Sequence, residues 1–165
     1  MKTTEPGVME HGIVGCGVIG CGMIAETYHL PALVQCEGVK LITACDVDAG
    51  RSESISKKFG FENWTDDYHD VLGNPKIKAV FILTKSNTHK QLAEEAAKAG
   101  KHIFMQKSIT DTMEDAEELL NIVKTCGIHF TVSFMHRYFD ECVKAAELLQ
   151  ENVLGELQQV RIQNC

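Results

Sequence analysis

The chain has 165 residues, which is enough for one full hydrophobic core, and its fractions of hydrophobic residues (44%) and charged residues (24%) are ordinary for a globular protein. The net charge of −7 argues against a nucleic acid or an anionic membrane as partner, and no apolar run reaches the roughly 18 residues of a membrane span. The seven cysteines are odd in number and form no CxxC pair, which favours buried thiols in a reducing cytoplasm over a disulfide framework or a zinc site.

The first motif is a glycine-rich turn that follows a polar lead, residues 1–10. We expect no signal peptide, because Glu5 and Glu10 interrupt any hydrophobic leader. Residues 12–19 predict a strand, and residues 23–36 predict a helix that is broken or bent at Pro31. A strand, a glycine-rich turn and a helix in this order are typical of a dinucleotide-binding turn, in which the helix N-terminus faces the pyrophosphate.

Two registers of the glycine motif compete. One is Gly15-x-Gly17-x-x-Gly20 and the other is Gly20-x-Gly22-x-x-Ala25. The first register would place two glycines in the first turns of the helix, where each costs about 1 kcal/mol relative to alanine. The second leaves the helix start free of glycine and puts Asp46 21 residues after Ala25, near the spacing of about 20 expected for a ribose-binding acid. We therefore favour the second register.

Asp46 ends the next predicted strand, residues 39–45. It can bind the adenosine ribose of a dinucleotide, or it can cap the helix that follows. A carboxylate that accepts both ribose hydroxyls repels a 2′-phosphate, which favours NAD, whereas the nearby Arg51 leaves NADP as an alternative.

The remaining elements continue the alternation of strand and helix. We expect helices at residues 49–59, 66–72, 88–99 and 111–126, and strands at residues 61–64, 77–83, 102–105 and 128–134. This order predicts an α/β fold, a doubly wound parallel Rossmann sheet with its ligand at the carboxyl ends of the strands.

The pattern changes after residue 136. Residues 139–151 predict an amphipathic helix, and residues 157–162 alternate like a strand with one buried face. We expect residues 1–136 to form the dinucleotide-binding domain and residues 137–165 to begin a second domain that is truncated. An unpaired strand edge invites pairing, so we expect residues 139–165 either to form a homo-oligomer or to be disordered.

Several short motifs together resemble the glucose–fructose oxidoreductase, inositol dehydrogenase and rhizopine-catabolism family (Gfo/Idh/MocA). Their order and spacing carry the resemblance through nearly the whole chain. The motifs are Gly20-Cys-Gly-Met-Ile-Ala25, His29-Leu-Pro-Ala-Leu33, Asp46, Thr84-Lys-Ser-Asn-Thr-His89, Ala99-Gly-Lys-His102, Gln106-Lys-Ser108, Phe134-Met-His-Arg-Tyr138 and Val153-Leu-Gly-Glu-Leu-Gln-Gln-Val-Arg161.

The resemblance implies an NAD-dependent oxidoreductase that transfers hydride to or from a sugar, a polyol or a related carbonyl compound, like a trans-1,2-dihydrodiol dehydrogenase or a sugar dehydrogenase. It implies that the phosphate turn is formed by Gly20, Gly22, Met23 and Ile24, that the adenosine end is bound by Asp46 and Arg51, and that the nicotinamide end is lined by Thr84, Asn87, His89, Gln106, Lys107 and Arg137. Lys107 would be the catalytic residue, as a general acid, and no metal is implied.

The chain also departs from the family pattern. Gln106 and Ser108 replace the glutamate and proline of a Glu-Lys-Pro motif, and Lys85 stands where proline is usual. The family's Asp-x-x-x-His catalytic pair would lie beyond residue 165. We therefore expect weak or no activity from this chain, and the alternatives are a non-catalytic dinucleotide-binding or regulatory module, or a fragment without independent function. Two histidines each have two alternative roles. His29 either packs within the helix region or contacts a phosphate, and His89 either caps a helix or contacts the cofactor.

Overall fold

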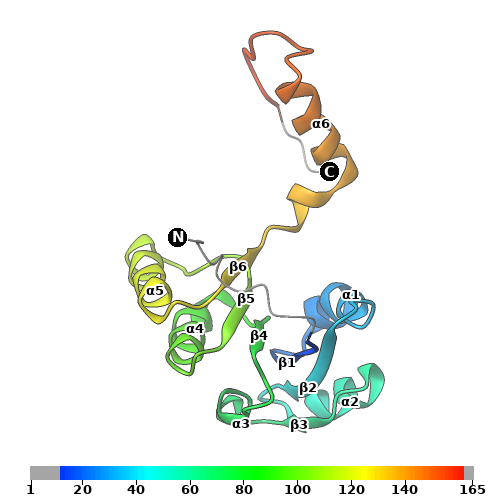
Figure 1. Ribbon diagram of the computed structural model, residues 1–165, viewed down its shortest axis with the longest axis vertical. Coiled ribbons are helices and arrows are strands. Elements are labelled where there is room, and N and C mark those ends of the chain that lie inside the picture. Colours follow the sequence, from blue (N-terminus) through cyan, green and yellow to red (C-terminus); the bar gives the residue numbers. More distant parts are fainter. Residues whose placement is uncertain (1–11, 162–165) are drawn as a thin grey trace, which may run out of the picture. The chain divides into compact units, whose positions relative to one another are not determined.

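Six strands lie in one sheet in the computed structural model, which describes residues 12–161 (Figure 1). All neighbouring strands are parallel, and their order is β3-β2-β1-β4-β5-β6. The strands are β1 (Val14–Ile19), β2 (Val39–Cys45), β3 (Asn63–Thr65), β4 (Ala79–Ile82), β5 (His102–Gln106) and β6 (Phe130–Ser133). The predicted doubly wound Rossmann fold is confirmed, and its strand order reverses between β1 and β4.

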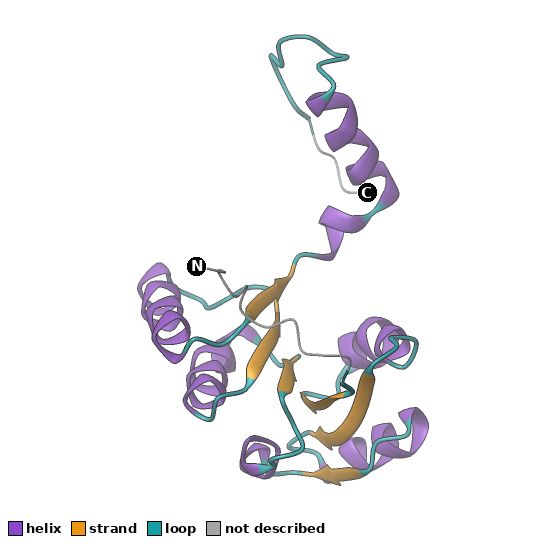
Figure 2. Ribbon diagram, viewed as in Figure 1, coloured by secondary structure: helices purple, strands orange, loops and turns teal. Residues whose placement is uncertain are grey.

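Helices cover both faces of this sheet (Figure 2). One face packs against η1 and α1, which form one continuous helix, and against α2; the other packs against α3, α4 and α5. Their bounds are η1 (Ala25–His29), α1 (Leu30–Leu33), α2 (Ala49–Phe59), α3 (Tyr68–Gly73), α4 (His89–Lys98) and α5 (Met113–Cys126), with a short 3-10 turn, η2 (Ser86–Thr88), before α4. Each face therefore has its own buried apolar cluster, and the strand ends between them remain free for a ligand.

The helix boundaries follow from capping side chains and glycines. The Asp48 carboxylate accepts a hydrogen bond from the backbone N–H of Arg51 at the start of α2, and Gly60 ends that helix with a left-handed φ of 76°. Thr112 and Gly127 serve the same two roles for α5. Caps of this kind are local in sequence, which is why these ends could be predicted.

Pro31 lies inside the first helix and does not break it. The preceding turn is π-helical, and the N–H of Leu30 donates to the carbonyl of Ala25. A wider turn relieves the clash between a proline ring and the carbonyl four residues earlier, so the chain stays helical to Leu33.

The chain divides into two compact units between Ser133 and Phe134. The second unit contains η3 (Met135–Tyr138) and α6 (Asp140–Gln150). The strand predicted at residues 157–162 was wrong for residues 157–161, which form neither strand nor helix; Ile162, the lead at residues 1–10 and Cys165 lie outside the described residues. Alternating side chains form a strand only when a neighbour completes the backbone hydrogen bonds, and residues 157–161 pair with no other strand among the described residues.

Candidate functional site

The turn between β1 and η1 has small residues at three positions. Gly20 has a φ of 95°, and a Cβ there would lie 2.8 Å from the carbonyl carbon of Leu83. At Gly22, in contrast, a Cβ would meet no protein atom within 4 Å. Ala25 is completely buried in the cluster formed with α1 and α2. A tight turn, an open approach to the backbone and a small packing residue are what a dinucleotide turn requires, in that order.

The competing register is explained by packing inside the sheet. Gly15 and Gly17 lie within β1, ahead of the turn. A Cβ at Gly15 would lie 2.0 Å from the carbonyl oxygen of Lys76, and one at Gly17 would lie 2.5 Å from Cγ1 of Val71. These two glycines therefore let α3 and the segment before β4 approach the strand, and they do not form the turn.

A cleft of about 740 Å³ lies at the carboxyl ends of the strands and is lined by the glycine turn. It also contains residues from the ends of β2 and β4, the two neighbours of β1. An open α/β sheet binds its ligand in this place, outside the carboxyl ends of the strands at the point where the strand order reverses. The residues predicted from sequence that line it are Gly20, Gly22, Met23, Ile24, Asp46, Arg51, Thr84 and Asn87.

Asp46 joins the glycine turn to the end of β2. Its side chain is 7% exposed, and Oδ2 accepts a hydrogen bond from the backbone N–H of Cys21 at 2.8 Å. Oδ1 accepts from the N–H of Asp48 at 3.0 Å and from Nη1 of Arg51 at 3.0 Å. A carboxylate has about four acceptor positions, so these three bonds leave room for one more donor, and for two if Arg51 moves away. Asp48, and not Asp46, caps α2, so the alternative role of Asp46 as a helix cap was wrong.

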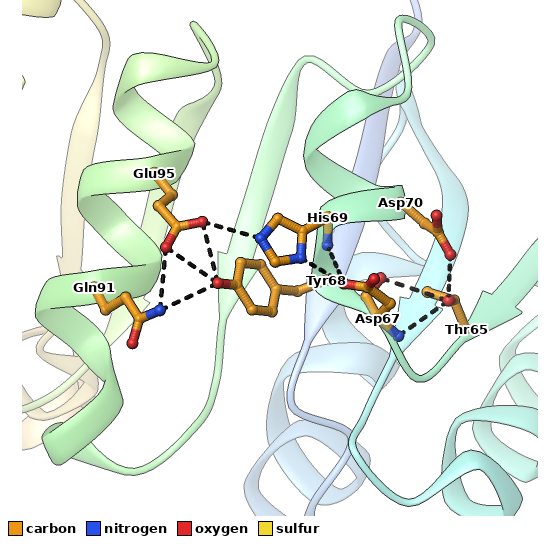
Figure 3. A network of polar contacts seen from close by, with 7 residues as sticks. All are labelled: Thr65, Asp67, Tyr68, His69, Asp70, Gln91 and Glu95. Atoms are coloured by element: carbon orange, nitrogen blue, oxygen red, sulfur yellow. Dashed lines mark hydrogen bonds and ion pairs between the residues drawn. The ribbon is translucent and has the colours of Figure 1, made fainter.

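Tyr68 and Gln91 also line the cleft, although no sequence motif points to them (Figure 3). The Tyr68 hydroxyl lies 3.1 Å from both carboxylate oxygens of Glu95, and Nε2 of Gln91 donates to the same hydroxyl at 3.2 Å. The phenol is therefore held in place at the junction of α3 and α4. No motif could have identified it, because these side chains meet only after the two helices pack.

His69 extends this network on the side of Tyr68. Its Nδ1 lies 2.6 Å from Asp67 and its Nε2 lies 3.4 Å from Glu95, while the ring stacks on Tyr68 with centroids 4.1 Å apart (Figure 3). The Asp67 carboxylate is the main cause of a raised pKa for His69, and Glu95 adds to it. Protonated His69 on α3 can therefore form an ion pair with Glu95 on α4 as well as with Asp67.

Three further polar side chains that we singled out from the sequence are buried and do not line the cleft: His29, His89 and Gln106. His89 is completely buried, with Nδ1 2.6 Å from the carbonyl oxygen of Ser108 and Nε2 3.1 Å from that of Thr84, so it neither caps the helix nor reaches the cleft. It holds together the two loops that follow β4 and β5.

His29 and Gln106 form the other buried polar pair. The Gln106 oxygen accepts from the backbone N–H of Lys107 at 2.8 Å, so its amino group faces Nε2 of His29 at 3.3 Å. That ring nitrogen must then accept, which requires a neutral ring, and burial lowers the pKa of His29 in agreement. His29 also packs edge-on against Phe104, so it serves helix packing and makes no contact with the cleft.

Lys107 and Arg137 remain to be placed. The Lys107 side chain is exposed at the end of β5 and is not part of the cleft lining. Arg137 lies on η3 in the second unit, which is described by itself. Within residues 12–161 no group of histidine, cysteine and acidic side chains is arranged to hold a metal ion, and no helix is both long and apolar enough to cross a bilayer.

Comparisons with known proteins agree with this geometry. Residues 14–134 match the family model described as an oxidoreductase family with an NAD-binding Rossmann fold. A scyllo-inositol 2-dehydrogenase (NAD(+)) of Bacillus subtilis is 34% identical over 130 residues, which cover 78% of this chain and 38% of the relative. A myo-inositol 2-dehydrogenase of Thermotoga maritima is 28% identical over 82% of this chain and 41% of its own length.

Solved structures extend the similarity to three dimensions. A scyllo-inositol dehydrogenase of Lactobacillus casei with bound NAD(H) and scyllo-inositol is similar with a TM-score of 0.81 at 28% identity, over 87% of this chain and 42% of that one. A 3-ketoreductase of Actinomadura kijaniata in complex with NADP has a TM-score of 0.80 at 27% identity, over 87% of this chain and 44% of that one. The chain thus spans less than half the length of these relatives. It belongs to the Gfo/Idh/MocA oxidoreductase family and carries the family's NAD-binding Rossmann domain.

Proposed function

We propose that the cleft binds NAD(H) and that the chain is the cofactor-binding half of a dehydrogenase of sugars or polyols. The observation that carries the proposal is the pairing of the Gly20–Ala25 turn with Asp46 across one cleft. The free N–H groups at the helix start receive the pyrophosphate, and the carboxylate receives the adenosine ribose hydroxyls. The bound nicotinamide supplies hydride chemistry.

The cofactor fits the residues that are present. The space beyond Gly22 is free of protein atoms, so a phosphate can approach the backbone there. Asp46 has acceptor capacity left for a ribose hydroxyl, and Thr84 and Asn87 line the part of the cleft that follows β4, where we place the nicotinamide half. Arg51 is half exposed and can turn toward a 2′-phosphate, so NADP is a second cofactor.

The substrate class rests on the relatives, which include dehydrogenases of scyllo-inositol and myo-inositol. Lys107 and Arg137 are assigned to the nicotinamide end by resemblance alone, whereas His89 and Gln106 are buried away from the cleft and are not proposed for it. Lys107 would hold and donate the proton at its ammonium group. The cytoplasm suits the six described cysteines, which are free thiols, and self-association through residues 139–165 stays a prediction.

The test is titration of the full chain with NADH and NADPH, followed by nucleotide fluorescence and calorimetry. We expect NADH to bind, and a folded sample that binds neither nucleotide rejects the proposal. A panel of inositols, aldoses and sugar acids with NAD then measures turnover as NADH absorbance. We expect little or none, because a substrate misplaced by about 1 Å already loses about 100-fold in rate.

A second candidate is a non-catalytic module that binds or senses NAD(H). The position of Lys107 outside the cleft lining favours it, since a proton donor must lie within hydrogen-bond reach of the reacting atom. Turnover that disappears in Lys107→Ala would exclude the module and would establish that this chain builds a complete site. Binding without turnover for any substrate is the result that the module predicts.

A further inference from the structure

The cleft is lined by two basic side chains, and they differ in what already neutralises them. Arg51 lies 3.0 Å from Asp46 and 3.4 Å from Asp48, so its charge is matched by two carboxylates. Lys85 is exposed at the cleft, and no hydrogen bond or ion pair joins its ammonium group to any of residues 12–161. The Thr88 hydroxyl donates a hydrogen bond to the Lys85 backbone carbonyl at 2.9 Å. Lys85 is therefore the cleft cation whose charge is available to a ligand.

Lys85 is held close to the glycine turn by the residue before it. A Cβ at Gly20 would lie 3.0 Å from Cγ2 of Thr84, so the loop after β4 touches the turn after β1. Thr84 is in turn fixed by a hydrogen bond between its hydroxyl and that of Thr88 at 2.8 Å, in which Thr84 can be the donor. Lys85 follows in extended backbone, with φ −80° and ψ 151°, and it lines the same cleft as Gly22.

The charge of the whole chain makes one local cation important. The net charge is −7, and Asp46 and Asp66 also line the cleft, so the surroundings repel an anion. The helix N-terminus supplies only partial positive charge. A dinucleotide brings two negative phosphates to this point, and a cleft with low-dielectric walls strengthens the effect of a charge placed inside it.

We infer that Lys85 binds the pyrophosphate of the dinucleotide and completes a phosphate site that the glycine turn begins. This inference rests on the proposed function and adds to it a residue for which the family pattern has no charge.

The experiment compares Lys85→Gln and Lys85→Arg with Lys124→Gln in the full chain. Lys124 is an exposed lysine in the last turn of α5, and its replacement by glutamine changes the net charge equally. The probes are NADH, ADP-ribose, which has the pyrophosphate without nicotinamide, and adenosine, which has no phosphate. We expect Lys85→Gln to weaken NADH and ADP-ribose alike by about fivefold at low salt, the upper range for an exposed ion pair. Adenosine binding should be unchanged, and Lys85→Arg should stay within about twofold of the unaltered chain because it keeps the charge.

Salt gives an independent readout, since the difference between the unaltered chain and Lys85→Gln should fade at about 1 M salt, where the screening length is about 3 Å. Unchanged ADP-ribose binding in Lys85→Gln would overturn the inference, and a loss confined to NADH would assign Lys85 to the nicotinamide half. An equal loss in Lys124→Gln would also overturn it, because the effect would then belong to net charge.

If the unaltered folded chain binds none of the probes, the proposed function itself fails. If it binds them and Lys85→Gln binds them equally well, only this inference fails. Thermal unfolding of each variant, followed by circular dichroism, confirms that the samples compared are folded.

Discussion

Gly17 and Gly22 lie five residues apart, and alanine should affect them in opposite ways. At Gly17 a Cβ would lie 2.5 Å from Cγ1 of Val71 and 3.0 Å from Cδ1 of Ile77, whereas non-bonded carbons prefer about 3.5–4.0 Å. Both neighbours are buried core side chains with little freedom to move. We expect Gly17→Ala to lower the free energy of unfolding by about 1–3 kcal/mol, the usual cost of overpacking. For a chain of this length that lowers the melting temperature by roughly 2–12 °C.

Gly22→Ala should leave the fold intact and remove the function. A Cβ there meets no protein atom, and the backbone φ of Gly22 is outside the left-handed range, so alanine fits without strain. It can even stabilise the chain by about 0.4–1 kcal/mol through the unfolded state. The same Cβ occupies the approach to the pyrophosphate, and overpacking of about 1–3 kcal/mol in the complex weakens NADH by about 5- to 150-fold.

The assay is a pair of measurements on each variant: thermal unfolding without ligand, and NADH fluorescence titration below the transition. The expected result is that stability falls in Gly17→Ala alone and affinity falls in Gly22→Ala alone. NADH binding that survives in Gly22→Ala would refute the assignment of the phosphate turn to Gly20–Ala25. A folded Gly17→Ala sample that has lost affinity would return the turn to the Gly15–Gly20 register.

Three further predictions concern side chains around the cleft. Asp46→Asn should weaken NADH more than NADPH in parallel titrations, because the amide loses the acceptor for ribose hydroxyls and no longer repels a 2′-phosphate; equal losses would contradict the ribose role. His69→Gln should remove a stabilisation that is present below about pH 6.5 and fades as the pH rises through the raised pKa of folded His69, and melting curves of both proteins between about pH 5 and 8 should therefore converge at the alkaline end. Burial raises the pKa of Cys21 and of Cys45 to about 12, so peptide mapping after brief iodoacetamide treatment should find the exposed Cys126 alkylated and these two intact until the protein is unfolded.

The parts of the fold that could be predicted from sequence are those whose signals are local. Apolar runs of strand length and glycines after helices mark most boundaries, because the caps and the hydrophobic periods lie within a few residues of one another. The register of the glycine turn could also be chosen, since a helix start without glycine and the spacing to Asp46 both favour Gly20–Ala25. Gly15 and Gly17 offered a competing register because packing of β1 against the segment before β4 and against α3 also demands glycine.

What could not be predicted depends on contacts between distant segments. Tyr68 and Gln91 reach the cleft only because α3 packs beside α4, and neither helix carries a motif that says so. His89 has a helix-start position that suggests capping, yet its ring points into the core between two loop carbonyls. Residues 157–161 show the reverse failure: their alternation is local, but a strand also needs a partner.

Gln106 replaces the glutamate of the Glu-Lys-Pro pattern and so removes a negative charge at the carboxyl end of β5. Gln106 orients its oxygen toward the Lys107 backbone and its amino group toward His29, and both side chains of this pair are buried and uncharged. A glutamate at position 106 would place a carboxylate near His29 Nε2, and a buried carboxylate there needs a protonated ring to face it. Glutamine gives the same hydrogen-bond geometry without any charge. The neutral pair can therefore hold the Lys107 backbone in place. It cannot supply a carboxylate that stabilises the ammonium form of Lys107, the proposed proton donor.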